Sequence, residues 1–297
     1  MSINFAPNIW SMGIEAVLEL FKLRLSFLVV VSCILSYQMG AEIWIWKEVL
    51  WLVLAGFLLA GGSNAANQVL ERSWDALMNR TMNRPLPTNR LTSAQGWLIA
   101  FVSSGIGIFI LFYFLNFASG ILGVGAFVSY VFVYTPLKRI TPWAVFVGAF
   151  PGAIPPMIGY VAASNHFGLE AGLLFAVQFM WQFPHFWAIA WVSHEDYTRG
   201  GYRLLPFNDL PDKRVAFQIL IYTMFLIPVS LLPWALPLSS PMVGNWAAVI
   251  CILSGLYFVW LSWKLYLNPT MGNARKVMFA SFFYLPLIQI AYVIDQL

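Results

Sequence analysis

Nine apolar stretches, each long enough to cross a membrane, dominate this chain. They lie near residues 25–41, 49–66, 95–115, 120–135, 143–163, 170–192, 215–236, 243–263 and 277–294. An α-helix needs about twenty apolar residues to cross the ~30 Å hydrocarbon core of a bilayer. Only 9% of the residues are charged, against roughly 25% in a soluble domain. The sequence therefore predicts an all-α, polytopic membrane protein with nine transmembrane helices, folded as one domain over residues 1–297.

The basic residues predict the orientation of these spans. With nine spans, all but Lys47 of the 16 lysines and arginines fall near the N terminus or in connections that follow even-numbered spans. Positive residues remain on the cytoplasmic side, so the N terminus is predicted to be cytoplasmic and the C terminus outside. The net charge of +4 is thus a topology signal, and we expect no nucleic-acid partner.

The segment before the first span, residues 1–24, has a helical apolar face. Ile9, Ile14, Val17, Leu18 and Phe21 recur at helical spacing. Such a segment is typical of a helix that lies in the membrane interface, and we expect it to lead into the first span.

Acidic residues are rare, and one group of them follows the second span in a loop over residues 67–94. Asn67, Glu71 and Asp75 recur every four residues, and four helical residues turn about 400° and rise about 6 Å, so the three side chains form one stripe. Mg²⁺ prefers such oxygen ligands, often together with substrate phosphates. Arg80 and Arg84 continue the spacing, and guanidinium groups match phosphate oxygens. The pattern predicts a site for Mg²⁺ and a diphosphate; a solvated helix end with snorkelling arginines is the structural alternative.

A second acidic group follows the sixth span, in a loop over residues 194–214. It opens with "HEDYTRGGYRLLP", which places Glu195 and Asp196 on the same predicted side of the membrane as the first group. Two carboxylate loops on one side of the membrane place the metal site on an equal footing with the structural alternative, and the residues alone leave both open. A glycine-rich nucleotide loop of the Walker type is absent from the sequence.

Several motifs in order resemble the UbiA-type intramembrane prenyltransferases. They are the Asn67 to Pro85 stretch, "YTPLKRITP" (134–142), "GAFPGAIPPMIGYVA" (148–162), "WQFPHFWAIA" (181–190) and "EDYTRGGYRLLP" (195–206). The resemblance is dense over residues 60–210 and narrows to the heme-farnesylating branch. It implies nine helices around a central cavity, in a bacterial-type cytoplasmic (inner) membrane. It also implies transfer of the farnesyl group of farnesyl diphosphate to a vinyl group of protoheme IX (heme b), giving heme O.

The resemblance further implies the parts of the site. Mg²⁺ is the implied cofactor, and the implied partners are farnesyl diphosphate, heme b, the lipid bilayer, and a heme-handling enzyme or oxidase assembly factor. The implied metal ligands are Asn67, Glu71 and Asp75 with an acid of the second loop, either Glu195 or, by preference, Asp196, which directly precedes the motif tyrosine. Diphosphate contacts are assigned to Arg80, Arg84, Lys138 and Arg139.

Two departures from the family pattern concern the metal. The first signature usually has aspartate where this chain has Glu71, so the metal geometry must absorb one more methylene. In the wider family the second signature carries acids four residues apart, whereas Asp196 is followed at that spacing by Gly200.

Two residues inside the spans are candidates for other roles. Tyr134, at the end of the fourth span, could stabilise an allylic cation through its ring, although a tyrosine at a helix end is commonly an interfacial anchor. His185 follows Pro184, which frees a backbone carbonyl. It is therefore either a histidine satisfied by such a carbonyl or a heme contact, since imidazole is a common heme ligand.

Three rival functions remain open from the sequence. The same fold could serve a quinone precursor or another aromatic acceptor. An ion-coupled transporter would also hold acids within the membrane, but transporters place them near the midplane, whereas these lie at the ends of spans. A purely structural subunit has no need of two carboxylate loops.

Overall fold

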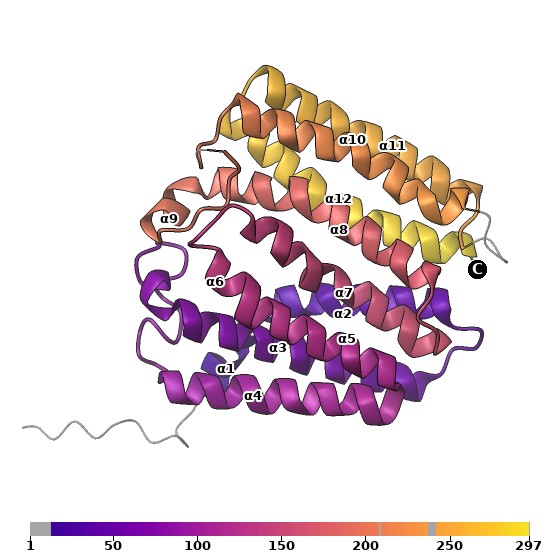
Figure 1. The fold of residues 1–297 in the computed structure, drawn as a ribbon, viewed down its shortest axis with the longest axis horizontal. Coiled ribbons are helices and arrows are strands. Elements are labelled where there is room, and N and C mark those ends of the chain that lie inside the picture. Colours follow the sequence, from indigo (N-terminus) through magenta and orange to yellow (C-terminus); the bar gives the residue numbers. More distant parts are fainter. Residues whose placement is uncertain (1–12, 208, 237–241, 297) are drawn as a thin grey trace, which may run out of the picture.

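The computed structural model describes residues 13–207, 209–236 and 242–296. Within these ranges nine long helical rods run side by side across Figure 1. They are α2 (Leu23–Gly40), α3 (Trp46–Asp75), α4 (Ser93–Ile110) with η1 (Leu111–Leu115), α5 (Phe117–Val128) with η2 (Ser129–Tyr134) and α6 (Thr135–Leu137), α7 (Ala144–Ser164), α8 (Leu169–Val192), α10 (Lys213–Ala235), α11 (Asn245–Leu267) and α12 (Met271–Gln296). Two short helices, α1 (Ile14–Phe21) and α9 (His194–Arg199), complete the fold.

These rods confirm the predicted all-α membrane fold. Eight of them are long and apolar enough to cross a membrane. The ninth, α8, is as long as its neighbours and packs against α7, α10 and α12, but Gln178, Gln182 and His185 reduce its hydropathy. The third and fourth predicted spans are separate helices, because Asn116 caps the start of α5 by accepting a hydrogen bond from the Ser119 amide at 2.9 Å.

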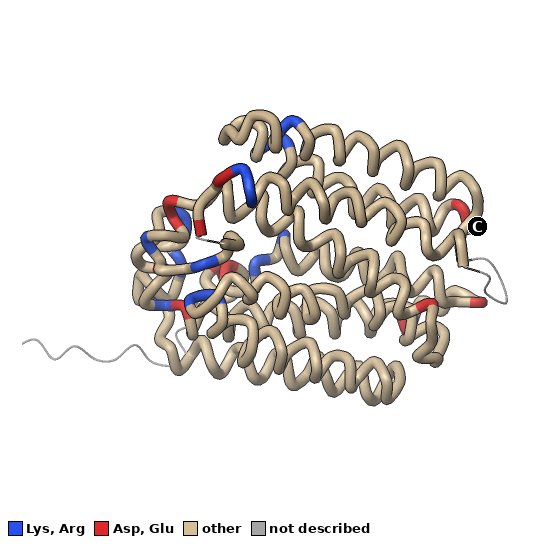
Figure 2. Tube along the Cα trace, turned by 45° about the horizontal axis from the view of Figure 1, so that its top comes forward, with Lys and Arg blue, Asp and Glu red and all other residues tan. Residues whose placement is uncertain are grey.

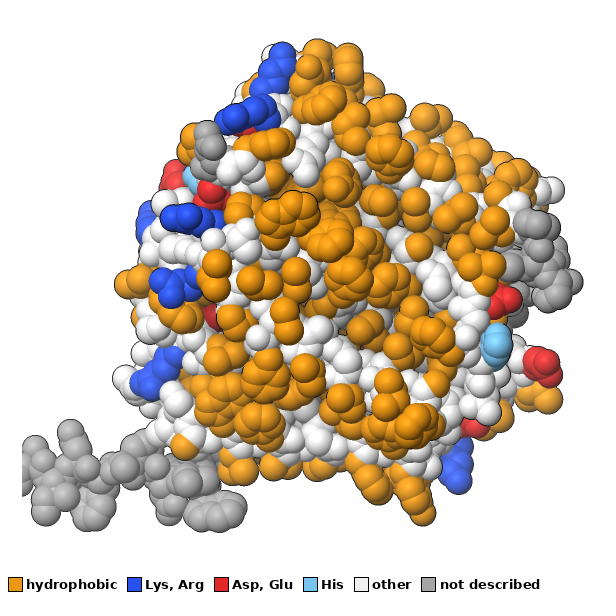
Figure 3. Space-filling model, viewed as in Figure 1, with side chains coloured by type: hydrophobic (Ala, Val, Ile, Leu, Met, Phe, Trp, Pro, Cys, Tyr) orange, Lys and Arg blue, Asp and Glu red, His pale blue; other side chains and the backbone are white. Residues whose placement is uncertain are grey.

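Charge and hydropathy divide the molecule along its length. Most lysines and arginines gather at the end of the bundle that carries α9 (Figure 2). We call this the charged end; it comprises residues 76–92, 138–143, 193–207, 209–212 and 268–270. Between the two ends, hydrophobic side chains cover the face shown in Figure 3. An exposed apolar surface of this extent suits a protein whose solvent is lipid.

The first loop begins as a helix. Helix α3 has 30 residues and continues well beyond the predicted end of the second span at residue 66. The acidic stripe therefore lies on regular helix, as its four-residue spacing predicts.

Helix α7 is held to its neighbours through proline-freed carbonyls and close contacts. Pro156 has no N–H to donate to the Gly152 carbonyl, and the side-chain amide of Gln178 donates to that carbonyl instead, at 2.8 Å. Further along, Gly159 packs directly on α2. A Cβ at this position would lie 2.0 Å from the Cys33 carbonyl oxygen. Helices α2 and α7 therefore approach as closely as glycine permits.

We expect Gly159→Ala to lower stability by about 1–3 kcal/mol, because the added methyl must push two backbones apart. The thermal unfolding midpoint of the detergent-solubilised protein measures the effect. Gly172→Ala in α8 is the control, since a Cβ there meets nothing within 4 Å. Equal midpoints for the two variants would contradict the close α2–α7 contact.

The predicted N-terminal interfacial helix is present in part, as α1. Ala16 and Leu20 form its buried face, whereas Ile14 and Leu18 are exposed. Residues 1–12, including Ile9 of the predicted apolar face, lie outside the described residues. Helix α1 packs against α3, so its exposed apolar side chains face away from the bundle.

Candidate active site at the charged end

The acidic stripe on α3 is buried at the charged end. Asn67, Glu71 and Asp75 are 2%, 5% and 1% exposed. The side-chain amide of Asn67 donates to the Thr135 hydroxyl at 3.1 Å, which leaves its amide oxygen available to another group. A solvated helix end would expose these side chains, so the burial argues against the structural alternative.

Basic side chains from two other segments neutralise the buried acids. Lys138 forms an ion pair with Glu71, and Arg84 donates to one carboxylate oxygen of Asp75 at 2.7 Å. The other oxygen of Asp75, Oδ1, is buried without a hydrogen-bond partner among the described residues. Burying a carboxylate oxygen without a partner costs free energy, and a bound cation would offset that cost.

Lys22 is a third cation at this site. It lies between α1 and α2 with a positive φ of 46°. Burial lowers the pKa of Lys22 to about 7, and repulsion from Arg84 and Lys138 adds to this effect while Glu71 and Asp75 oppose it. The Lys22 amine is therefore within electrostatic range of the same four charged groups. The sequence assigned this lysine only to membrane topology.

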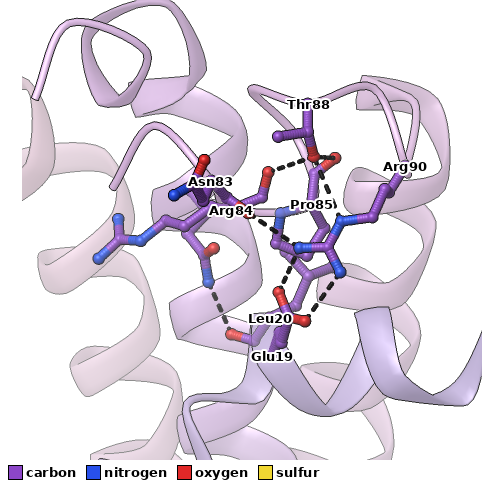
Figure 4. A network of polar contacts seen from close by, with 8 residues as sticks. Glu19, Leu20, Asn83, Arg84, Pro85, Thr88 and Arg90 are labelled. Carbon is purple, nitrogen blue, oxygen red and sulfur yellow. Dashed lines mark hydrogen bonds and ion pairs between the residues drawn. The ribbon is translucent and has the colours of Figure 1, made fainter. Parts of the chain in front are cut away.

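Helix α1 is fastened to the first loop beside the site (Figure 4). The Arg90 guanidinium donates to both carboxylate oxygens of Glu19, at 2.8 and 2.6 Å, and to the Asn83 carbonyl at 2.9 Å. The side-chain amide of Gln68 also donates to the Leu20 carbonyl at 2.8 Å. These bonds hold the segment that carries Lys22 against α3 and its loop.

The second loop joins the first through Asp196. Its two carboxylate oxygens accept hydrogen bonds from the backbone amides of Asn79 and Arg80, at 3.3 and 3.2 Å. The Arg80 side chain in turn donates to the Tyr197 hydroxyl at 3.1 Å. The two acidic loops, far apart in sequence, thus fold against each other.

Two predicted site residues lie apart from this group. Glu195 points into solvent and is 88% exposed, with Arg199 4.0 Å away as its ion-pair partner. Arg139 is exposed and stacks on the Trp74 ring at 4.0 Å. Among the described residues, no three His, Cys, Asp or Glu side chains gather as a metal-binding group. The carboxylates of α3 contact cations instead, and Asp196 contacts two backbone amides and the Arg199 guanidinium, the latter at 3.3 Å.

Two tyrosines line the buried charges. The Lys138 ammonium lies 4.9 Å from the centre of the Tyr134 ring and 5.6 Å from that of Tyr202. Tyr202 is 3% exposed, and its hydroxyl has no hydrogen bond of good geometry with the described residues. Burial and the charges of Glu71 and Asp75 raise its pKa. Tyr202 is a site residue that sequence reasoning missed.

His185 lies on α8 and faces α12, and its ring packs on that of Trp181 with ring centres 4.3 Å apart. Its Nδ1 is 2.8 Å from the Ser281 hydroxyl, and that hydroxyl donates its single proton to the Met278 carbonyl at 2.6 Å. Ser281 must therefore accept from Nδ1–H, which leaves Nε2 with its lone pair. A neutral imidazole with a free Nε2 is the form that ligates metals. The partner of His185 is thus a side chain rather than a proline-freed carbonyl.

Comparison with known proteins decides the family. A model of the UbiA prenyltransferase family matches residues 27–285. The chain belongs to the UbiA prenyltransferase family. A protoheme IX farnesyltransferase from Christiangramia forsetii is 44% identical over 94% of this chain and 92% of the relative. One from Flavobacterium psychrophilum is 41% identical over 99% and 98%.

Solved structures of the UbiA family share the fold. A structure of digeranylgeranylglyceryl phosphate synthase aligns with a TM-score of 0.78 at 17% identity, covering 95% of this chain and 98% of that one. A UbiA homolog from Archaeoglobus fulgidus, bound to GPP and Mg²⁺, aligns with a TM-score of 0.66 at 13% identity over 94% and 99%. At these identities the likeness concerns the fold, and it extends over nearly the whole chain.

Proposed function

We propose that this membrane enzyme transfers the farnesyl group of farnesyl diphosphate to a vinyl group of protoheme IX (heme b), giving heme O. The observation that carries the proposal is the buried charged group: Glu71 and Asp75 surrounded by Lys22, Arg84 and Lys138. Such a group suits a diphosphate and its counter-ion at the end of an apolar bundle. Similarity over nearly the full chain to proteins named protoheme IX farnesyltransferase supports the choice of acceptor.

The residues on α3 fit a magnesium ion. The free amide oxygen of Asn67, the carboxylate of Glu71 and the unpartnered Oδ1 of Asp75 offer the oxygen donors that Mg²⁺ prefers. We assign the second-loop contribution to Asp196, which faces the first loop, rather than to exposed Glu195. When bound, Mg²⁺ supplies positive charge that stabilises the diphosphate as a leaving group.

The cations of the site bind the remaining diphosphate oxygens. Arg84 and Lys138 now contact carboxylates, and we propose that a diphosphate exchanges these contacts for its own oxygens. Arg80 lies at the junction of the two loops, held by Tyr197, and is assigned to a further diphosphate contact. Arg139, stacked on Trp74, is assigned to a diphosphate contact from the edge of the site.

Tyr134 is placed to stabilise the allylic cation that forms as the carbon–oxygen bond breaks. Its ring packs against Gly148 of α7, where a Cβ would lie 2.5 Å from the ring, so the plane of the ring is fixed. An aromatic face stabilises a nearby cation by about 0.5–2 kcal/mol. The central cavity expected of the family would hold the farnesyl chain beyond this ring.

Lys22 is the most direct test of the diphosphate site. We expect Lys22→Gln to raise the KM for farnesyl diphosphate about tenfold, because one charge–phosphate contact of roughly 1.4 kcal/mol is lost. The KM for heme should change little. Lys22→Arg is the matched control, since it keeps the charge. A heme KM that rises as much as the diphosphate KM would argue for general damage to the site.

His185 is assigned to heme through its free Nε2. The expected result of His185→Ala is a shifted Soret band of heme bound to the purified enzyme, because the iron loses an imidazole ligand. His166→Ala is the control, since His166 is exposed in the connection that precedes α8. An unchanged spectrum would remove His185 from the heme site.

The charged end is proposed to face the cytoplasm of a bacterial-type inner membrane, with the C terminus outside. The support is the distribution of basic residues. A heme-handling enzyme or oxidase assembly factor in the same membrane would then supply heme b and receive heme O.

Membranes containing the enzyme, supplied with heme b, farnesyl diphosphate and Mg²⁺, test the function directly. We expect heme O, identified by its mass, and its loss when EDTA removes the metal. Membranes that carry the Asp75→Asn variant provide the control. If the membranes prenylated a benzoate or quinone precursor but did not prenylate heme b, the choice of acceptor would be overturned.

A further inference from the structure

A long groove runs along the outer surface of the bundle between α11 and α12, away from the candidate active site. Its volume is about 910 Å³. The walls are mostly apolar and aromatic, and Tyr257 and Phe283 are 57% and 74% exposed. Helices α11 and α12 pack together, so the groove follows their contact line.

The groove extends deep into the membrane. It is lined from Lys264 at the charged end to Ile250 on the same helix. At 1.5 Å per residue these positions are about 21 Å apart along the axis, more than half of the ~30 Å hydrocarbon core. A groove of this length can hold an acyl chain that enters from the leaflet at the charged end.

Two lysines stand at the charged end of the groove. Lys264 and Lys276 both line it, one from the end of α11 and one from the start of α12. Within the described ranges, no acidic side chain forms a salt bridge with either lysine. The Lys264 ammonium lies 3.4 Å from the centre of the Trp260 ring, and tryptophan is enriched at the level of lipid headgroups.

We propose that this groove is a binding site for an anionic phospholipid from the leaflet at the charged end. The lipid phosphate pairs with Lys264 and Lys276, and an acyl chain lies along the aromatic walls towards Ile250. Charge complementarity selects an anionic headgroup, because two uncompensated cations at the membrane surface attract one strongly. The site is distinct from the prenyl-transfer site and does not depend on the proposed function.

Native mass spectrometry of the purified full chain with phosphatidylglycerol or phosphatidylcholine tests the proposal. We expect tighter binding of phosphatidylglycerol, and about thirtyfold weaker binding of it to the Lys264→Gln/Lys276→Gln variant, since each lysine contributes roughly a factor of five. Arg275→Gln is the matched control, because Arg275 is exposed beside Lys276 but does not line the groove.

A second variant tests the groove apart from the lysines. Ala280 lines the groove and is half-buried, so Ala280→Phe fills it while both cations remain. We expect this variant to retain phosphatidylglycerol more weakly than the native chain. Equal binding of the two lipids, equal loss in the Arg275 variant, or undiminished binding to the Ala280 variant would each overturn the proposal. Thermal unfolding midpoints without lipid establish that the variants are folded.

Discussion

Exchanging Asp75 for asparagine is expected to lower kcat for prenyl transfer by about 10²–10³-fold, the loss seen when one preorganised electrostatic partner is removed. Asp75 is 1% exposed and has one carboxylate oxygen without a partner. The variant keeps the shape of the side chain but loses the charge that we assign to Mg²⁺. The Mg²⁺ concentration that gives half-maximal rate should also rise.

Transfer of farnesyl from radiolabelled farnesyl diphosphate to heme, measured over a range of Mg²⁺ concentrations, gives both quantities. Glu42→Gln is the control, because Glu42 is an exposed carboxylate at the opposite end of the bundle. If the Asp75 variant kept the native rate with Mg²⁺ saturating, the carboxylate would not contribute to the chemical step. The proposed metal site on α3 would then be wrong.

The membrane fold could be predicted from the sequence because hydrocarbon leaves few alternatives. A segment that crosses the bilayer must satisfy every backbone group internally, so apolar length alone indicates the helices. All nine predicted spans correspond to helical rods of the described chain. The boundary at residue 66 was less accurate, because polar residues can continue a helix at the membrane surface, as α3 does to Asp75.

The candidate site was predicted less completely, since its contacts join distant segments. The spacing of Asn67, Glu71 and Asp75 predicted a shared stripe, and the structure buries all three. The approach of Lys22 was not foreseeable, because one lysine before a span looks like a topology signal. Tyr202 was missed for a similar reason: in a chain with 17% aromatic residues, burial alone distinguishes it.

The pair of Glu71 and Lys138 allows folding and catalysis to be separated. Both side chains are nearly buried, 6% and 11% exposed. Lys138→Met leaves the Glu71 carboxylate without its ion-pair partner, which costs about 3–5 kcal/mol for a buried pair. We therefore expect a marked fall in the unfolding midpoint of this variant, together with loss of prenyl transfer.

The double variant Glu71→Gln/Lys138→Met removes both charges and should recover most of that stability, because replacing a whole buried pair by neutral groups is often close to neutral. Activity should remain at the level of the single variant, since the double variant has neither the carboxylate proposed for Mg²⁺ nor the ammonium proposed for the diphosphate. Thermal unfolding and prenyl transfer, measured on the same preparations, separate the two effects. If activity recovered together with stability, the pair would serve only to hold α3 against the segment after α6, and the catalytic charges would have to be sought among Asp75, Arg84 and Lys22.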